Sequence, residues 1–231
     1  MGLYHPCLTS IQLKAFALGS NSMVRLNLIQ EINLLWNPVY PYLARHIAER
    51  YGRRDGALLE IGPFSGVIFA LQQKKIGNTF CIATFPSGMG RFFLREARRR
   101  NLEDQIDILE TDASLADVED QRIDLAVFRG AFFFPSLFEV NLRRIHKILR
   151  PNGMAFIGGG FGKFTPETII QDIADRSRDL NLKIGKHNVR KDRLREDIQA
   201  LNIKGSVDVT TEGGLWVVMR KGEASETTPS V

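Results

Sequence analysis

The chain of 231 residues has little cysteine, with only Cys7 and Cys81. Two thiols are too few for a disulfide framework or a zinc cluster, and the four histidines show no metal-ligand spacing. Cys81 lies inside an apolar run, so we expect it to be a small core residue. The sequence therefore predicts no metal site and no chemistry at either cysteine.

Long hydrophobic runs are also absent, because no run approaches the ~18 residues of a membrane span. The start, Met1 to Pro6, lacks the charged and then apolar order of a secretory signal. We therefore expect a cytoplasmic protein that does not associate with a membrane. Hydrophobic residues make up 44% of the chain, enough for a substantial core, and the length fits one α/β domain with additions.

Positive charge is in modest excess, with a net charge of +5 and an isoelectric point near 9.4. Two segments carry the excess, and their basic residues are Arg91, Arg95, Arg98, Arg99 and Arg100, then Lys183, Lys186, Arg190, Lys191, Arg193 and Arg195. Such clusters can attract nucleic acid, but more often they form solvated helix faces. Few aromatic residues interleave with them, which argues against a platform for single-stranded nucleic acid.

Residues 1–54 predict helices that cap or flank a pocket. Apolar residues recur at helical spacing from Leu26 to Leu35 and again from Leu43 to Tyr51, and Asn37-Pro38 interrupts the pattern between them.

From residue 57 the pattern changes to alternating strands and helices. The strand candidates are Ala57–Ile61, Thr79–Thr84, Ile106–Glu110, Ile123–Phe128 and Met154–Gly158. Between them lie helix candidates at Val67–Lys75, Gly90–Asn101 and Leu137–Leu149, and a short turn at Leu115–Val118. Repeated units of this kind imply a parallel sheet with right-handed crossovers and helices on both faces. Ligands of such sheets bind at the carboxyl ends of the strands.

After Gly160 the alternation stops. Two helical segments, Thr165–Leu180 and Lys191–Leu201, precede the short strands Ser206–Thr211 and Gly214–Arg220, which predict an antiparallel hairpin. The predicted fold class is therefore α/β: a doubly wound, mostly parallel seven-stranded sheet with a C-terminal antiparallel hairpin and N-terminal helices.

Three parts follow from this pattern. They are a helical cap at 1–54, a sheet domain at 55–221 with a helical insert at about 160–205, and a disordered, small and polar tail at 222–231.

The most informative segment is Glu60–Gly66, Glu-Ile-Gly-Pro-Phe-Ser-Gly, which follows the apolar run Ala57–Leu59. It predicts a strand that ends at a tight glycine turn and continues into a helix. Gly62 permits backbone angles or a close ligand approach that a Cβ would block. Gly66 would let the next helix pack near the strand and point its free N–H groups toward a ligand. The alternative is an ordinary strand-to-helix turn that binds nothing.

Five segments, in the same order, resemble the class I S-adenosylmethionine-dependent methyltransferases. These segments are Glu60–Gly66, Leu109–Ala113, Asp124–Arg129, Ile145–Gly153 and Gly213–Val218. The resemblance covers roughly Tyr40 to Lys221. It implies a Rossmann-like α/β sheet finished by an antiparallel hairpin, extra helices before the first strand, and S-adenosylmethionine as the cofactor.

The resemblance also implies a set of cofactor contacts. The turn residues that would hold the methionine part are Glu60, Gly62, Pro63, Phe64, Ser65 and Gly66. Thr84 and Phe85 would face the ribose and adenine, and Asp112 with Ala113 would meet the adenine edge. Arg129, at the end of the fourth strand, would pair with Glu60, hold the cofactor carboxylate or hold an acidic acceptor.

Two departures from the family pattern bear on the cofactor. Phe64 replaces the middle glycine of the turn, and no Asp or Glu lies between Glu60 and Glu96, where the family has an acidic residue for the ribose hydroxyls. Ala83 or Thr84 stands at that place, and Thr84 would offer one neutral hydroxyl instead. Either the ribose contact comes from elsewhere or the cofactor binds less tightly. The same vacancy would suit a 2′-phosphate, which leaves a dinucleotide open, although the predicted hairpin argues against it.

Methyl transfer from a sulfonium is an in-line displacement that needs alignment and exclusion of water, so it requires neither a metal nor a covalent nucleophile. Phe132 and Phe133 follow the fourth strand, and with Phe161 they predict an apolar wall for a small acceptor. Core packing is the alternative role of these rings. The segment lacks the polar-Pro-Pro-aromatic motif of members that methylate amino groups of nucleic acid, and the sequence identifies no general base.

We therefore predict an S-adenosylmethionine-dependent methyltransferase whose acceptor is a small, partly apolar molecule that can be anionic. Two alternatives remain open: a methyltransferase-like protein that binds a nucleotide or a partner without catalysis, and an RNA methyltransferase. The sequence does not fix the oligomeric state, and a homodimer is compatible with it.

Overall fold

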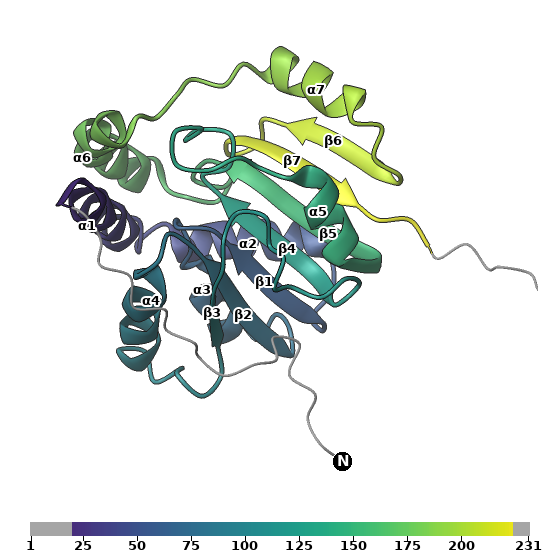
Figure 1. Ribbon diagram of the computed structural model, residues 1–231, viewed down its shortest axis with the longest axis horizontal. Helices are drawn as coiled ribbons and strands as arrows, with labels where there is room; N and C mark the ends of the chain where they lie inside the picture. Colours follow the sequence, from purple (N-terminus) through teal and green to yellow (C-terminus); the bar gives the residue numbers. More distant parts are fainter. Residues whose placement is uncertain (1–19, 224–231) are drawn as a thin grey trace, which may run out of the picture.

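The computed structural model of the protein describes residues 20–223. A seven-stranded sheet in the order β3-β2-β1-β4-β5-β7-β6 runs through its centre (Figure 1). The strands are β1 (Ala57–Ile61), β2 (Thr79–Thr84), β3 (Asp107–Glu110), β4 (Ile123–Arg129), β5 (Leu149–Gly159), β6 (Ser206–Thr210) and β7 (Leu215–Arg220). Only β7 runs antiparallel to its neighbours, so the predicted fold class, including the closing hairpin, is confirmed.

Helices cover both faces of the sheet, with α2 and α3 behind it and α5 in front of it in Figure 1. The helices are α1 (Ser20–Leu35), α2 (Tyr40–Tyr51), α3 (Val67–Gln73), α4 (Met89–Arg98), α5 (Leu142–Ile148), α6 (Glu167–Ile184) and α7 (Lys191–Ala200). The N-terminal helix α1 packs against α6, from the insert after β5, and the two lie side by side at one end of the molecule (Figure 1).

The core lies around β1 and β4, whose residues are all buried. These strands have neighbours on both edges and helices on both faces, which explains why their sequences are nearly continuous apolar runs. The edge strand β6 instead alternates between exposed and more buried positions, as a strand with one solvated face does.

Two boundaries differ from the sequence-based prediction. The helix expected over Leu137–Leu149 begins only at Leu142, where the side chain of Asn141 accepts a hydrogen bond from the backbone N–H of Arg144 and caps it. The fifth strand begins at Leu149 rather than Met154. Leu149 pairs with Ile123, and the register shifts before the next pair, Leu125 with Met154, so the segment Arg150–Gly153 forms an irregularity within the strand.

Residues 1–19 and 224–231 lie outside the described part of the chain, and with them most of the predicted tail and the first third of the predicted cap. None of the helices within 20–223 combines the length and apolarity that a membrane span needs.

Asp124, near the start of β4, joins three segments that are distant in sequence. Its carboxylate accepts 2.8 Å hydrogen bonds from the backbone N–H of Ala57 and from Arg150, and Arg53 lies 3.5 Å away. We expect Asp124→Ala to destabilise the protein by about 1–3 kcal/mol, because the N–H at the start of β1 loses its acceptor. Denaturant unfolding measures this change.

Asp172→Ala is the matched control, since Asp172 forms only an exposed pair with Arg176 on the same helix. Its expected cost is below about 1 kcal/mol. Equal costs for the two variants would contradict the role of Asp124.

Candidate functional site

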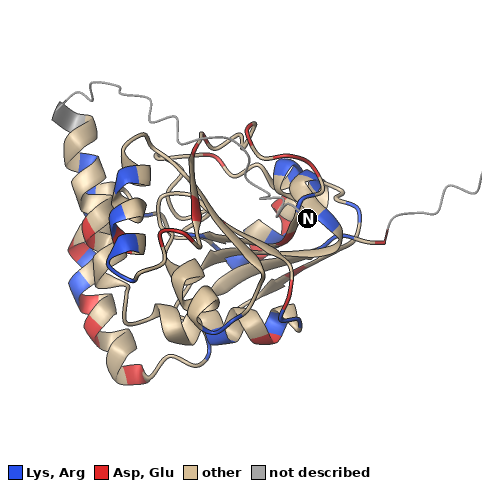
Figure 2. Cartoon of the chain, turned by 90° about the horizontal axis from the view of Figure 1, so that it is seen from below, with Lys and Arg blue, Asp and Glu red and all other residues tan. Residues whose placement is uncertain are grey.

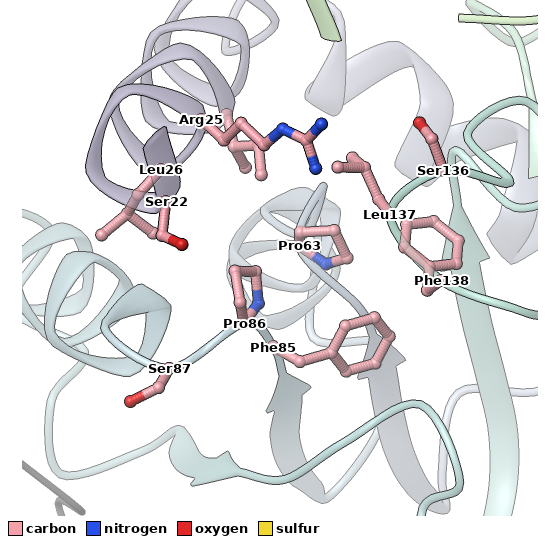
Figure 3. A pocket seen from close by; sticks show the side chains of 11 residues that line it. Ser22, Arg25, Leu26, Pro63, Phe85, Pro86, Ser87, Ser136, Leu137 and Phe138 are labelled. Atoms are coloured by element: carbon pink, nitrogen blue, oxygen red, sulfur yellow. The ribbon is translucent and has the colours of Figure 1, made fainter. Parts of the chain in front are cut away.

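A cavity of about 180 Å³ lies at the carboxyl ends of β1 and β2 and is covered by α1 (Figure 3). Three groups of residues line it: Ser22, Arg25, Leu26 and Ile29 from α1; Pro63, Phe85, Pro86 and Ser87 from the turns after β1 and β2; and Ser136, Leu137 and Phe138 from the loop after β4. This is the edge of a parallel sheet at which ligands bind. Of the predicted site residues, Pro63 and Phe85 line this cavity.

The glycine turn after β1 requires its two glycines. Gly62 has a φ of 94°, and a Cβ there would lie 2.6 Å from Cε2 of Phe128. Gly66 has a φ of 146°, and a Cβ there would lie 2.6 Å from Cε2 of Tyr40. Each glycine therefore provides both a backbone conformation that side chains disfavour and room for an aromatic ring.

Glu60 caps the helix that follows the turn. Its buried carboxylate accepts hydrogen bonds from the backbone N–H groups of Gly66, Val67 and Ile68, at 2.8, 3.2 and 2.9 Å. The sequence led us to expect these N–H groups to point at a ligand, and that expectation is wrong, because the carboxylate satisfies them inside the protein. Ser65 is also buried, and its hydroxyl donates to the carbonyl oxygen of Gly62 at 2.8 Å.

Three side chains from outside the turn hold its backbone from the other side, and we call Asn33, Tyr40 and Arg129 the brace. Asn33 of α1 donates to the carbonyl oxygen of Pro63 at 2.7 Å. Arg129 of β4 donates through Nε to the carbonyl oxygen of Phe64 at 2.9 Å. Its Nη2 donates to the hydroxyl of Tyr40 at 2.9 Å, and that hydroxyl lies 3.3 Å from the Asn33 side-chain oxygen. The N-terminal helices are thereby bonded to the glycine turn.

Arg129 is a buried cation surrounded by aromatic rings. Its guanidinium carbon lies 4.7 Å from the ring centre of Trp36, 5.1 Å from that of Tyr40 and 6.0 Å from that of Phe64. Only 4% of the residue is exposed. Cation–π contacts and the nearby carboxylate of Glu60 compensate this burial. Within the described residues, Arg129 thus contacts the turn and the cap and does not line the cavity.

Phe64 fits at the place of the family's middle glycine because its side chain points into the core. Its ring packs against Phe134 at a centroid distance of 4.5 Å. It also fills the space beside Gly130, where a Cβ would lie 2.5 Å from Cδ2 of Phe64. Phe64 is 1% exposed, so the substitution leaves the cavity open.

Near the end of β2, the polar side chains of Thr84 and Glu110 form hydrogen bonds with backbone groups of the protein. Thr84 is fully buried, and its hydroxyl donates to the carbonyl oxygen of Gly62 at 3.3 Å. Glu110, which pairs with Thr84 across β2 and β3, accepts from the backbone N–H groups of Gly88 and Gly90 at 2.9 and 2.8 Å. No carboxylate is among the residues that line the cavity within the described part of the chain.

Asp112 and Ala113 follow β3, at the same edge of the sheet as the cavity. Asp112 is exposed, and its Oδ1 accepts from the backbone N–H of Ser114 at 2.8 Å. Ala113 is half-buried, and neither residue lines the cavity itself.

The aromatic residues predicted for the acceptor do not meet at the cavity. Phe161 stacks on Trp36 at 4.7 Å, Phe133 lies against Gly159, and Phe132 is half-buried with a φ of 66°. The cavity takes its aromatic lining from Phe85 and Phe138 instead, which pack edge-to-face at 5.5 Å.

Sequence reasoning did not identify the four α1 residues or the loop residues Ser136, Leu137 and Phe138 as site residues. The apolar periodicity of α1 indicated a helix that covers a pocket, but it gave no reason to select Arg25 or Ser22. No group of three His, Cys, Asp or Glu residues within 20–223 is arranged to hold a metal ion.

Glu60 makes the stability of the turn depend on pH. Burial raises its pKa from 4.5 to about 7, although the three N–H donors and Arg129 act in the opposite direction. Because the folded-state pKa is the higher one, the stability it contributes is complete below about 4.5 and is lost as the pH rises through about 7.

We expect the free energy of unfolding to fall between pH 6 and pH 8 in the wild type, and this slope to be smaller in Glu60→Gln, which cannot titrate. Denaturant unfolding across this range measures both slopes. Burial lowers the pKa values of His46 and His146, so their contributions change mainly below this range and are common to both proteins. Parallel curves would show that Glu60 does not titrate there.

Comparisons with known proteins agree with this arrangement. Residues 59–157 match the family model of the methyltransferase domain. No curated protein sequence matches the chain.

Three solved structures share the fold. A Methanococcus maripaludis protein described as a candidate S-adenosyl-L-methionine-dependent methyltransferase is 24% identical with a TM-score of 0.72, over 92% of this chain and 99% of that one. A candidate O-methyltransferase from Nostoc punctiforme is 14% identical with a TM-score of 0.60, and the match covers 87% of this chain and 61% of that one. PigF, solved with S-adenosylhomocysteine (SAH), is 16% identical with a TM-score of 0.58, and the match covers 87% of this chain and 60% of that one.

The family match covers the glycine turn, the strands β2 to β4 and most of β5. Residues 59–157 thus resemble a methyltransferase domain, and the chain shares its fold with structures described as S-adenosylmethionine-dependent methyltransferases.

Proposed function

We propose that the protein transfers the methyl group of S-adenosylmethionine to a small, partly apolar acceptor. The observation that carries the proposal is a glycine turn that Glu60 and the brace hold rigid beside a cavity at the carboxyl edge of the sheet. Methyl transfer depends on alignment of donor and acceptor, and a site held by rigid elements provides that alignment.

The residues at this edge fit the cofactor. Phe85 and Pro86 offer apolar surface, and Ser87 and Ser136 offer hydroxyl groups that can bond to the ribose in place of the family's carboxylate. Asp112 and Ala113 follow β3, where the family binds the adenine edge. S-adenosylmethionine would supply an activated methyl group there.

The protein's own contribution is to position and enclose the reactants. Apolar side chains from α1 and from the loop after β4 line the cavity on opposite sides, as Figure 3 shows, and limit the access of water. A small acceptor with apolar surface matches this lining. We propose no general base, because no His, Asp, Glu or Lys lines the cavity among the described residues.

A binding measurement separates this proposal from a non-catalytic methyltransferase-like protein. We expect calorimetry to detect S-adenosylmethionine binding at submillimolar concentration, weaker than in relatives with a ribose carboxylate, because neutral hydroxyls give less energy than charge-assisted bonds. Absence of binding at millimolar cofactor would refute the enzyme. RNA binding is measured separately across a range of salt concentrations. An affinity for RNA that falls steeply as the salt concentration rises would favour the RNA methyltransferase instead.

The brace yields a second test on a matched pair of tyrosines. Tyr40→Phe removes the hydroxyl that Arg129 bonds, whereas Tyr51→Phe, on the same helix, removes a hydroxyl that bonds the backbone oxygen of Asp55 at 2.8 Å, away from the cavity. We expect similar stability losses of about 1 kcal/mol from each variant.

Only Tyr40→Phe should also weaken SAH binding, by about fivefold, because the turn loses part of its support. Calorimetry on both variants measures the difference. An unchanged affinity in Tyr40→Phe would mean that the brace supports the fold alone.

A further inference from the structure

We infer that Arg25 of α1 binds a carboxylate group of the ligand that occupies the cavity. The inference rests on the proposed function and assigns a charge requirement to the same site. Binding of a ligand carboxylate was one of three roles that the sequence left open for Arg129, and the inference assigns it to a residue on a different element of the fold.

Arg129 is unsuited to that role because its donors are already in use. Its Nε and Nη2 bond the Phe64 carbonyl and the Tyr40 hydroxyl, and three aromatic rings surround it. A ligand carboxylate could reach it only if the brace opened.

Arg25 has the opposite environment. It is the only charged residue that lines the cavity within the described part of the chain, and it is exposed. Its guanidinium extends from α1 across the cavity toward Leu137 on the opposite loop (Figure 3). No described residue forms an ion pair or a hydrogen bond with it. An arginine in this position can donate two parallel bonds to a carboxylate.

The remaining lining defines the rest of the ligand. It is mostly apolar, with the hydroxyls of Ser22, Ser87 and Ser136 as its other polar side chains. A molecule with an apolar body and one acidic group at the α1 end complements this arrangement, whereas a cation that has no acidic group would meet only the positive charge of Arg25 there.

The backbone of Arg25 is held in place although its side chain is exposed. Ile29 and Ile32 of the same helix are buried, Asn33 bonds the glycine turn, and α1 packs against α6. The guanidinium therefore extends from a fixed helix, which favours selective recognition over general attraction of anions.

A carboxylate in this cavity has two possible sources, the amino-acid part of the cofactor and an acidic acceptor. Binding of SAH and of 5′-methylthioadenosine, which lacks the amino-acid part, tests the first. Binding of phenylacetate and of phenylacetamide to the SAH complex, followed by ligand-observed NMR, tests the second. The tested variant is Arg25→Gln.

Arg91→Gln is the control, because Arg91 is an exposed residue of the neighbouring helix α4 that does not line the cavity. The basic residues of α4 gather beside α1 in Figure 2, so general electrostatic attraction has to be separated from a direct contact. Both variants change the net charge equally.

If Arg25 binds the cofactor carboxylate, Arg25→Gln weakens SAH about tenfold or more and leaves 5′-methylthioadenosine unchanged. If it binds an acidic acceptor, SAH affinity is kept, and the variant loses its preference for phenylacetate over phenylacetamide. Either result supports the inference, provided that Arg91→Gln behaves as the wild type.

The inference is overturned if Arg25→Gln matches Arg91→Gln in both arms. A wild type that binds neither SAH nor 5′-methylthioadenosine refutes the proposed function as well. If the wild type binds SAH and Arg25→Gln changes neither arm relative to Arg91→Gln, only the inference is refuted. The two failures are therefore distinguishable.

Discussion

The hydrogen bond from Arg129 to the carbonyl oxygen of Phe64 connects the parts of this molecule that have to act together. Arg129 ends β4, in the centre of the sheet, and Phe64 lies in the turn after the neighbouring strand β1. Through Tyr40 the same guanidinium reaches the N-terminal helices. A buried charge is costly unless it is bonded and paired, so these contacts depend on one another. The position of α1 over the cavity follows from this network.

The brace also explains how the turn departs from the family pattern without losing its cavity. Phe64 is accommodated because Gly130, next to Arg129, leaves room for its ring. Glu60 satisfies the first N–H groups of α3, and the brace satisfies the carbonyl groups of Pro63 and Phe64. Most polar groups of the turn therefore have partners within the protein. Ligand contacts then come from side chains of α1 and of the loops after β2 and β4.

Periodicity and turn chemistry predicted the fold well. The strands β1 and β2 have the predicted bounds, because buried parallel strands have an unambiguous apolar pattern. The site was predicted only in part. The family pattern located Pro63 and Phe85, but a pattern in sequence cannot show that Arg129 is enclosed by Trp36, Tyr40 and Phe64, which are 93, 89 and 65 positions away. Nor can it show that α1 brings Arg25 to the cavity, because that depends on tertiary packing.

A crystal structure of the complex with SAH tests the central claim most directly. We predict the ligand in the cavity beside Pro63 and Phe85, with the bonds from Arg129 to Phe64 and Tyr40 intact and with α1 and α2 in their present places. A complex in which Arg129 has left these partners and bonds the carboxylate of SAH would contradict it.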